Sequence, residues 1–314
     1  SEMCIRDREN TAVTKKKIKR CKEDVVFDAA CFIILTLVLF VVAYPLYWVI
    51  ISSISAPSAV SSGKVLLHPI GFTLKGYAEV FKNDQVMRGF LNSLIITFCG
   101  VMVNLIVTLP TSYALSRSNF SGKKPITIFY LITMFFGGGL IPTYLVIQRL
   151  QMLNTIWALI LPGCLSVYNM IVARTFFKSN ISEELYEAAE IDGCTQARFF
   201  FQIALPLSKA IIAILVLYYG VGHWNSYFSA LVYISDKAKY PLQLVLRNIL
   251  ITNQTALSQT ATTAAARAAL QEKQQLIDVM KYSLIIISSI PVLVMYPLVQ
   301  KHFVKGVMIG SMKG

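Results

Sequence analysis

Charged residues are scarce in this chain. Only 14% of its 314 residues are Asp, Glu, Lys or Arg, whereas a soluble domain carries about 25%. Hydrophobic residues make up 55%, and the mean hydropathy is +0.60. This composition excludes an ordinary soluble domain and predicts a protein that crosses a membrane several times.

The sequence also lacks the common catalytic and metal-binding patterns. Its six cysteines include no Cys-x-x-Cys pair and it has only three histidines, so neither a zinc site nor a disulfide framework is expected. The Walker A pattern Gly-x-x-x-x-Gly-Lys-Ser/Thr, the Gly-x-Ser-x-Gly pattern and the His-Glu-x-x-His pattern are all absent. We therefore expect no cofactor, no metal, no enzymatic activity and no ATP hydrolysis by this chain alone.

Basic residues exceed acidic ones, giving a net charge of +13. Nucleic-acid binding would explain such a charge, but the basic residues are scattered and no nucleic-acid-binding motif accompanies them. In a membrane protein, Lys and Arg collect in the cytoplasmic loops beside the spans. We therefore expect no nucleic-acid partner. We interpret the positive charge as an indication of which loops between the spans lie in the cytoplasm.

Six apolar stretches are long enough to cross a bilayer as a helix, which takes about 20 residues. They occupy residues 27–51, 89–115, 125–148, 155–175, 209–233 and 281–303. The first exceeds the apolar run of a signal peptide and has no small-residue cleavage site. The expected fold is all-α, with six transmembrane helices in a membrane domain over 27–303. A basic segment 1–26 precedes this domain and a short tail 304–314 follows it. Residues 1–8 resemble a translated sequencing adapter, and no expectation rests on them.

Basic residues lie in alternate connections between the spans. They are Lys15, Lys16, Lys17, Lys19, Arg20 and Lys22 before the first span, Arg117, Lys123 and Lys124 in the second connection, Arg174, Lys178, Arg198 and Lys209 in the fourth, and Lys301, Lys305 and Lys313 in the tail. With six spans these regions share one side, which the distribution of Lys and Arg assigns to the cytoplasm, with both termini. Outside lie 52–88, 149–154 and 234–280. In the last, the Ala-rich stretch 255–275 is either a helix or a flexible loop.

One connection, residues 180–208, carries the most specific pattern in the chain. It reads Glu-Ala-Ala, three residues, Gly, nine residues, Ile-x-Leu-Pro. Asn180 or Ser182 can cap a helix that Gly193 ends, and Thr195 can cap a second helix through Phe201. Pro206 prevents regular helix from running straight into the next span. The three-and-four spacing puts Leu185, Ala188, Ala189 and Asp192 on one thin helix face. A plain solvated connector would not require this spacing.

This pattern, between two apolar spans, resembles the signature loop of the membrane-spanning subunits of bacterial ABC importers. The resemblance implies that 180–208 is a cytoplasmic coupling loop that docks on a separate ATPase. The residues that match the family pattern or share its helix face are Glu187, Ala188, Ala189, Asp192, Gly193, Ile203, Leu205 and Pro206. Two positions depart from many relatives: Ala210, where Pro is frequent, and Cys194, where Ala is usual. Neither belongs to the fixed pattern.

Three further stretches resemble the carbohydrate-uptake branch of that family, and especially the oligosaccharide permeases of Gram-positive bacteria. They are 134–142, 223–228 and 240–245. The resemblance implies a location in the bacterial plasma membrane and five kinds of partner. These are a second homologous permease, a cytoplasmic ABC ATPase dimer, an extracellular solute-binding lipoprotein, a sugar substrate and membrane lipid.

Polar and aromatic residues within the spans are candidates for the sugar path. Amides, hydroxyls and rings are the groups that bind sugars, and polar side chains inside a membrane often face a pathway. The candidates are Asn104, Gly138, Asn169, His223, Trp224, Asn225 and Tyr227. Gly138 belongs to a run of three glycines that permits a helix break or close helix contact. The alternatives are helix packing, interhelical hydrogen bonds and interfacial aromatic belts.

The competing function is a self-sufficient secondary carrier driven by an ion gradient. Such a carrier favours ionisable residues at mid-membrane, and the centres of these spans contain almost none. A membrane enzyme is disfavoured in the same way, because the spans hold no acid-base pair.

Overall fold

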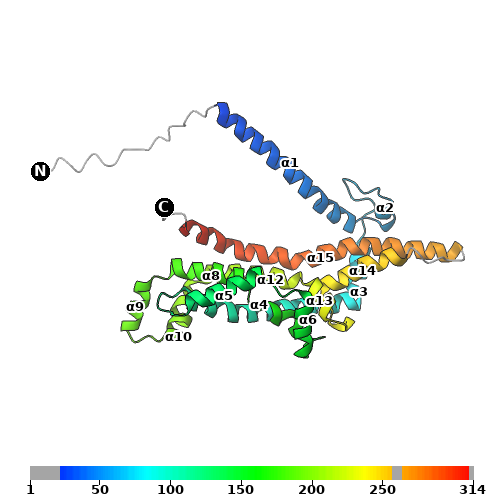
Figure 1. Cartoon of the computed structure of the whole chain (residues 1–314). Helices are drawn as coiled ribbons and strands as arrows, with labels where there is room; N and C mark the ends of the chain where they lie inside the picture. Colours follow the sequence, from blue (N-terminus) through cyan, green and yellow to red (C-terminus); the bar gives the residue numbers. More distant parts are fainter. Residues whose placement is uncertain (1–21, 257–263, 311–314) are drawn as a thin grey trace. The chain divides into compact units, whose positions relative to one another are not determined.

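The structure is a computed structural model that describes the backbone of residues 22–256 and 264–310. Every regular element within those two ranges is a helix, which confirms the all-α prediction (Figure 1). The chain divides into two units, the first ending at Trp48 and the second beginning at Val49. The basic residues 15–20 and the last four residues lie outside the described part.

The first unit consists of the greater part of α1 (Lys22–Ser53). Residues 26–53 of this helix are long and apolar enough to cross a membrane, as predicted for 27–51. Its large apolar side chains are exposed all around, for example Phe32 at 72% and Leu35 at 67%. A helix that is hydrophobic on every side fits a lipid environment.

In the second unit the most extensive helix packing involves α4 (Asp84–Ser116). Asn83 caps its start, because its side-chain oxygen accepts the N–H groups of Gln85 and Val86 at 3.0 and 3.2 Å. This helix packs against α8 (Val167–Asn180), α12 (Lys209–Trp224) and α14 (Leu242–Ala256) (Figure 1). Its buried positions include small or short polar residues at intervals of four or seven residues: Gly89, Ser93, Gly100, Asn104, Thr108 and Ser112. Small residues let neighbouring backbones approach closely.

Three of the predicted spans are broken rather than continuous. The stretch 125–148 forms α5 (Lys123–Phe135) and α6 (Leu140–Arg149), bent by 113° at the glycine run, where Gly139 has a φ of +83°. The stretch 155–175 forms α7 (Trp157–Ile160), the 3₁₀ turn η1 (Leu161–Gly163) and α8, bent by 52°. The stretch 209–233 is α12 followed by α13 (Tyr227–Tyr233). Of the two readings of the glycine run, the helix break is the one observed.

The last predicted span is part of α15 (Ala264–Gly310), in which residues 274–297 are apolar enough to cross a membrane. Its first residues belong to the Ala-rich stretch 255–275, which is therefore helical from Ala264 onward, while 257–263 lie outside the described residues. The expected tail continues the same helix through Gly310. Within the described ranges, three helices qualify as spans, or up to six if each bent pair counts as one.

Two short helices precede α4 in the second unit, α2 (Pro57–Ser61) and α3 (Lys75–Lys82), and both pack on α15. Buried residues form three clusters. The first includes Tyr113 and Phe177, the second includes Ile96 and Leu159, and the third includes Trp224 and Leu242. The first of these clusters joins α4, α8 and α12 to the loop that carries the signature pattern.

A glycine lets α3 lie directly on α15, and this contact generates the first prediction. A Cβ added at Gly76 would lie 2.5 Å from Ser283 Oγ and 2.8 Å from Val279 Cγ1. We expect Gly76→Ala to lower the free energy of unfolding by about 1–3 kcal/mol through overpacking. At Gly137 an added Cβ meets nothing within 4 Å, so Gly137→Ala is the control and should change stability by less than about 0.5 kcal/mol. Thermal unfolding of the purified chain in detergent measures both, and equal midpoints would contradict the close contact.

Candidate functional site

The signature loop begins with a capped helix, α9 (Glu183–Ile191). Ser182 is the cap, because its Oγ accepts the Leu185 N–H at 3.3 Å, whereas the Asn180 amide donates back to Phe176 O at 3.0 Å. Of the two caps that the sequence permits, the structure therefore uses Ser182. Glu183 and Glu184 occupy the first turn, where the helix dipole favours negative charge.

Gly193 ends α9 in the left-handed conformation that glycine adopts most easily, with a φ of +78°. Thr195 then caps α10 (Gln196–Phe199) by accepting the Arg198 N–H at 3.4 Å. Both features agree with the prediction. The second helix changes character after Phe199, however. It continues as the π-helix η2 (Phe200–Ala204) and the short α11 (Leu205–Leu207), which includes Pro206. The chain bends by 80° into α12 at Ser208, after the proline.

The two alanines of the signature lie on different faces of α9. Ala188 is exposed, whereas Ala189 is buried together with Tyr186 in the cluster around Tyr113 and Phe177. The prediction that both alanines share one partner-facing surface is therefore wrong for Ala189. Successive helical residues differ by about 100°, and Tyr186 and Ala189 form the three-residue pair that faces the chain's own core.

The outward surface of this loop carries large apolar side chains that the sequence reasoning did not single out. Ile191 is 88% exposed, Phe201 65% and Leu207 57%, alongside the exposed Glu187 and Pro206. Apolar side chains on the surface of a polar loop mark contact sites when they gather. Ile191 could have been noticed, because it lies in the variable part of the pattern two residues before Gly193, where a polar residue would suit a solvated helix end.

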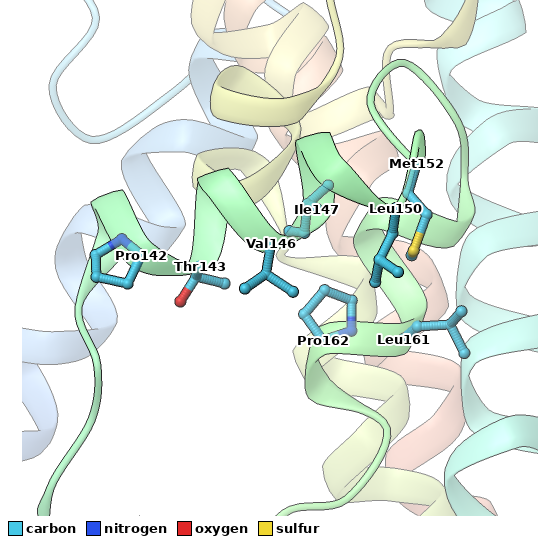
Figure 2. Close-up of a pocket in the computed structure, with 8 residues that line it drawn as sticks. All are labelled: Pro142, Thr143, Val146, Ile147, Leu150, Met152, Leu161 and Pro162. Atoms are coloured by element: carbon cyan, nitrogen blue, oxygen red, sulfur yellow. The ribbon is translucent and has the colours of Figure 1, made fainter.

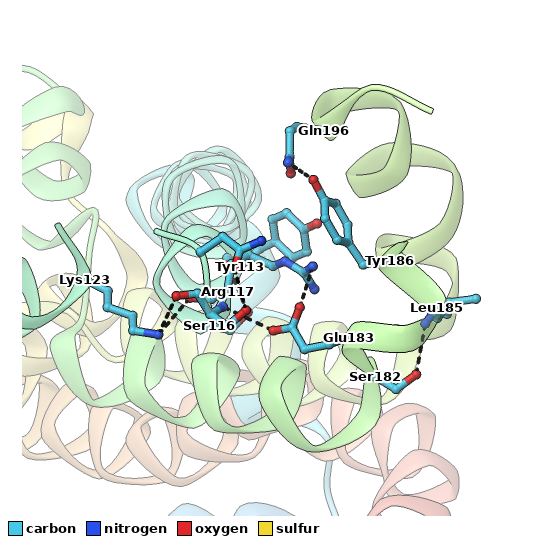
Figure 3. A network of polar contacts seen from close by, with 11 residues as sticks. Tyr113, Ser116, Arg117, Lys123, Ser182, Glu183, Leu185, Tyr186 and Gln196 are labelled. Carbon is cyan, nitrogen blue, oxygen red and sulfur yellow. Dashed lines mark hydrogen bonds and ion pairs between the residues drawn. The ribbon is translucent and has the colours of Figure 1, made fainter. Parts of the chain in front are cut away.

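A buried arginine holds α9 against the end of α4 (Figure 3). Arg117 is 9% exposed, and its guanidinium nitrogen lies 2.8 Å from Glu183 Oε2. The guanidinium carbon also lies 3.9 Å from the ring centroid of Tyr186 and 5.9 Å from those of Tyr113 and Phe199. We call these five residues the Arg117 clamp. Sequence reasoning used Arg117 only as a topology charge and did not predict this role.

Backbone groups extend the clamp. Glu183 Oε1 accepts the Ser118 N–H at 3.2 Å. Lys123 Nζ donates to the carbonyls of Arg117 and Ser118 at 3.2 and 2.9 Å, and Arg174 Nε donates to Leu115 O at 3.0 Å. These cations satisfy the carbonyl groups that a helix end leaves without intrahelical partners. The end of α4 is thus fixed by side chains from α5, α8 and α9.

The clamp joins a buried cation to a half-exposed anion. Breaking a buried ion pair by removing one partner costs about 3–5 kcal/mol, and solvent around Glu183 reduces that figure here. A desolvated cation–π contact adds up to about 2 kcal/mol. Burial, and then the nearby Glu190 carboxylate, raise the pKa of Tyr186 above its ordinary value of 10.0. The phenol therefore stays protonated at neutral pH, receives a hydrogen bond from Gln196 Nε2, and meets Arg117 through its ring.

A second candidate site is a cleft of about 480 Å³ between the break before α8 and the end of α12. Its polar side chains are Ser166, Asn169, Tyr218, Tyr219, His223, Ser226, Ser229 and Tyr233. Among the described residues the Asn169 amide has no hydrogen-bond partner, so it is available to a ligand. The sequence reasoning named Asn169 and His223 but missed Tyr218, Ser226 and Ser229, although Ser226 lies within the predicted cluster 223–227 and the other two lie close to it in the chain.

Asn104 lies behind this cleft and is fully buried. Its Oδ1 is 2.7 Å from His223 Nε2, and its Nδ2 donates to the carbonyls of Gly163 and Cys164 at 2.8 and 2.9 Å. Gly100 makes room for the imidazole, because a Cβ there would lie 2.5 Å from His223 Nε2. Asn104 thus ties the broken span to His223 and reaches the cleft only through that ring.

The other predicted path residues lie elsewhere. Trp224 is 2% exposed, donates its Nε1–H to Ser288 O at 2.9 Å and packs edge-on against Phe90, so it belongs to the core. Asn225 and Tyr227 are exposed at the break between α12 and α13 and do not line the cleft. Gly138 lies in the break between α5 and α6. The predicted cluster therefore divides between the cleft, the core and the surface.

A second hollow, of about 400 Å³, lies between α6 and η1 (Figure 2). Its side chains are Pro142, Thr143, Val146, Ile147, Leu150, Met152, Leu161 and Pro162. Only Thr143 offers a polar side-chain atom, so this hollow lacks the groups that orient a sugar. Within the described ranges, no three His, Cys, Asp or Glu side chains lie together as metal ligands would.

Among the known proteins similar to this chain are two curated bacterial proteins and one solved structure, and no protein-family model matches it. The chain is 36% identical over 288 residues to the polygalacturonan/rhamnogalacturonan transport system permease protein YtcP of Bacillus subtilis (strain 168), covering 92% of this chain and 98% of that protein. It is 38% identical over 289 residues to protein LplC of the same organism, covering 92% and 95%. The solved structure is a bacterial ABC transporter involved in the import of the acidic polysaccharide alginate. It matches with a TM-score of 0.81 and 27% identity over 90% of this chain and 99% of that chain.

The different surroundings of the adjacent Trp224 and Asn225 generate the second prediction. We expect Trp224→Ala to lower the free energy of unfolding by about 3–5 kcal/mol, because it empties a buried site and removes the indole hydrogen bond to Ser288 O. Asn225→Ala, at an exposed position next to it, should change stability by less than about 0.5 kcal/mol. Thermal unfolding and the yield of membrane-inserted protein measure this difference. Equal behaviour of the two variants would remove Trp224 from the core.

Proposed function

The chain belongs to the permease subunits of bacterial ABC importers for carbohydrates, and on that premise we propose how its two candidate sites divide the work. The outward surface of the signature loop binds the ATPase. The cleft between α8 and α12 forms part of the path for an oligosaccharide. The full importer contains a second homologous permease, a cytoplasmic ATPase dimer and an extracellular solute-binding lipoprotein, in a membrane whose lipid surrounds the spans.

The observation that carries the docking proposal is the 88% exposure of Ile191 at the end of a helix that is otherwise firmly held. Ser182 and Gly193 fix the ends of α9, and the Arg117 clamp fixes its inner face. A rigid helix that keeps a large apolar side chain in water gains free energy when a partner covers that side chain. Glu187 and Ala188 are also exposed on this helix. Glu187 adds a negative charge near Ile191, and the small side chain of Ala188 lets a partner approach the helix closely.

The position of the basic residues supports a cytoplasmic location for this loop. Arg117, Lys123 and Arg174 all bind backbone or side-chain groups at the end of α4 that meets α9. Lys and Arg mark the cytoplasmic ends of membrane spans. We therefore propose that α9 faces the ATP compartment and that both chain termini lie on the same side.

The cleft has the chemistry of a carbohydrate site. It offers an amide, serine hydroxyls and tyrosine rings, and its lining contains no Lys, Arg, Asp or Glu. Amides and hydroxyls bind sugar hydroxyls, and aromatic rings cover the apolar faces of sugar rings. The name of YtcP refers to polygalacturonan and rhamnogalacturonan and the alginate importer transports an acidic polysaccharide, so an oligosaccharide is the proposed substrate.

The proposed cycle links these sites through movement. ATP closes the ATPase dimer, the docked α9 moves as a rigid body, and the permease pair changes from an inward-facing to an outward-facing state. The solute-binding lipoprotein then releases sugar into the path, and hydrolysis resets the helices. The permease itself contributes binding surfaces and levers to this cycle, and the ATPase supplies the energy.

Docking is tested by placing charge on the exposed side of α9. We expect Ile191→Asp and Glu187→Lys to reduce co-purification with the ATPase at least tenfold. Docking would bury the new carboxylate of the first variant, and the second variant reverses a charge on the docking surface. That loss corresponds to about 1.4 kcal/mol or more of binding free energy. The matched control is Glu79→Lys in α3, which makes the same charge reversal away from α9. Membrane insertion should be normal in all three, and full co-purification of the Ile191 and Glu187 variants would refute the docking surface.

The cleft is tested by comparing two asparagines. Asn169→Ala removes an amide that lines the cleft, and we expect uptake per assembled complex to fall about 2–10-fold for a loss of 0.5–1.5 kcal/mol of hydrogen bonding. Asn225→Ala, outside the cleft, should leave uptake and sugar selectivity unchanged. Uptake of several labelled oligosaccharides into proteoliposomes that contain the whole importer measures both. If Asn225→Ala has the larger effect, the path runs past the α12–α13 break instead.

A further inference from the structure

We infer that Arg117 is a positioning residue that makes α9 move together with α4, and that α4 carries this movement to the sugar cleft. This inference rests on the proposed docking of α9 to the ATPase and adds the route by which the docked helix acts. Arg117 directly follows the last residue of α4, and side chains further back on this helix bind residues that line the cleft.

The covalent connections of α9 are not enough to fix its orientation. On one side a two-residue turn, Ile181–Ser182, joins it to α8. On the other side the chain passes through Gly193, a π-helix and an 80° bend before α12 begins. A π-helix and a left-handed glycine are places where a chain readily changes its path. The clamp supplies what these connections lack, because it binds the first turn of α9 directly to α4.

Arginine suits this contact better than any other cation. Its guanidinium is planar, so it can pair with the Glu183 carboxylate while it lies against the Tyr186 ring, 3.9 Å from the ring centroid. Two contacts in different directions fix the angle of α9 as well as its distance from α4. A lysine ammonium could pair with Glu183 but offers no flat face to the ring.

Three polar side chains continue from the clamp along α4 at four-residue intervals. Ser112 Oγ donates to Met170 O of α8 at 3.0 Å. Thr108 Oγ1 lies 2.7 Å from the Tyr219 hydroxyl of α12, and Asn104 binds His223 of α12 and the break before α8. We call Asn104, Thr108 and Ser112 the α4 ladder. Tyr219 and His223 both line the cleft, so the ladder ends on the proposed sugar path.

The dimensions fit a lever. Thirteen residues separate Asn104 from Arg117, which is about 20 Å along a helix that rises 1.5 Å per residue. If α9 moves, Arg117 moves the end of α4 with it. The three ladder residues of α4 then pass this movement to α8 and α12, whose residues line the cleft. Contact alone does not establish transmission, and the physical test is whether breaking the clamp changes energetic coupling while the parts remain assembled.

The experiment uses the whole importer in proteoliposomes and measures sugar transported per ATP hydrolysed. The clamp variants are Arg117→Gln, Arg117→Lys and Glu183→Gln. The controls are Lys124→Gln, which removes an exposed neighbouring cation, and Gly76→Ala, which destabilises the α3–α15 contact without touching the clamp. We expect the clamp variants to co-purify with the ATPase but to lose at least about fivefold in sugar transported per ATP, the lower range of allosteric coupling. Both controls should keep the wild-type ratio.

The outcomes separate this inference from the docking proposal. Failure of Ile191→Asp to weaken co-purification would refute docking. If docking holds and assembled Arg117→Lys and Glu183→Gln complexes keep the wild-type ratio, the clamp inference alone is refuted. Loss of assembly in every clamp variant, with both controls assembled, would also overturn it, because the clamp would then serve docking rather than transmission. A lowered ratio in Gly76→Ala would assign the effect to general loss of stability.

Discussion

The hydrogen-bonding needs of broken helices inside a membrane govern how this permease is built. Lipid offers no partner to a free carbonyl or N–H group, so non-helical backbone is tolerated only where protein groups satisfy it. Asn104 meets this need at the break before α8, where its amide binds the carbonyls of Gly163 and Cys164. Without that amide the break would leave two carbonyls without hydrogen bonds in an apolar environment. Gly163 and His223, which line the cleft, would also lose the side chain that holds them together. The long, unbroken α4 is the support that brings Asn104 to this place.

The same rule explains why polar residues in the spans do such different things. Trp224 and Asn104 are both buried, and each satisfies a backbone carbonyl of another helix. The carbonyl that Trp224 binds belongs to Ser288, three residues before Pro291 in the continuous helix α15. Asn169, in contrast, lies beside open space and retains free hydrogen-bonding capacity. Residue type alone does not distinguish a polar group that completes the fold from one that meets the substrate; its satisfied or unsatisfied state does.

The sequence predicted features that depend on local chemistry and missed those that depend on tertiary contacts. Hydropathy located the spans, and capping rules placed the start of α9 at Asn180 or Ser182 and its end at Gly193, because these preferences act within a few residues. Helical spacing also grouped Ala188 with Ala189, but it could not say which side of α9 meets the chain's own core. The clamp was beyond reach for the same reason. Sixty-six positions separate Arg117 from Glu183, and nothing local to either residue indicates that the two meet.

Arg117 unites two demands that the sequence presents separately. A cytoplasmic cation at the end of a span helps to orient a membrane protein, and any Lys or Arg serves that purpose. Burial changes the requirement, because a desolvated cation needs a carboxylate and polarisable surfaces around it. Glu183 and the rings of Tyr113, Tyr186 and Phe199 supply them, and two of those rings belong to the loop proposed to meet the ATPase. The charge that is proposed to mark the cytoplasmic side therefore also holds α9 against the end of α4. In the proposed transport cycle this contact is the stiff point at which movement of the ATPase reaches α4, and the bends at Ser208 and at the glycine run are the places where the remaining helices change their angles.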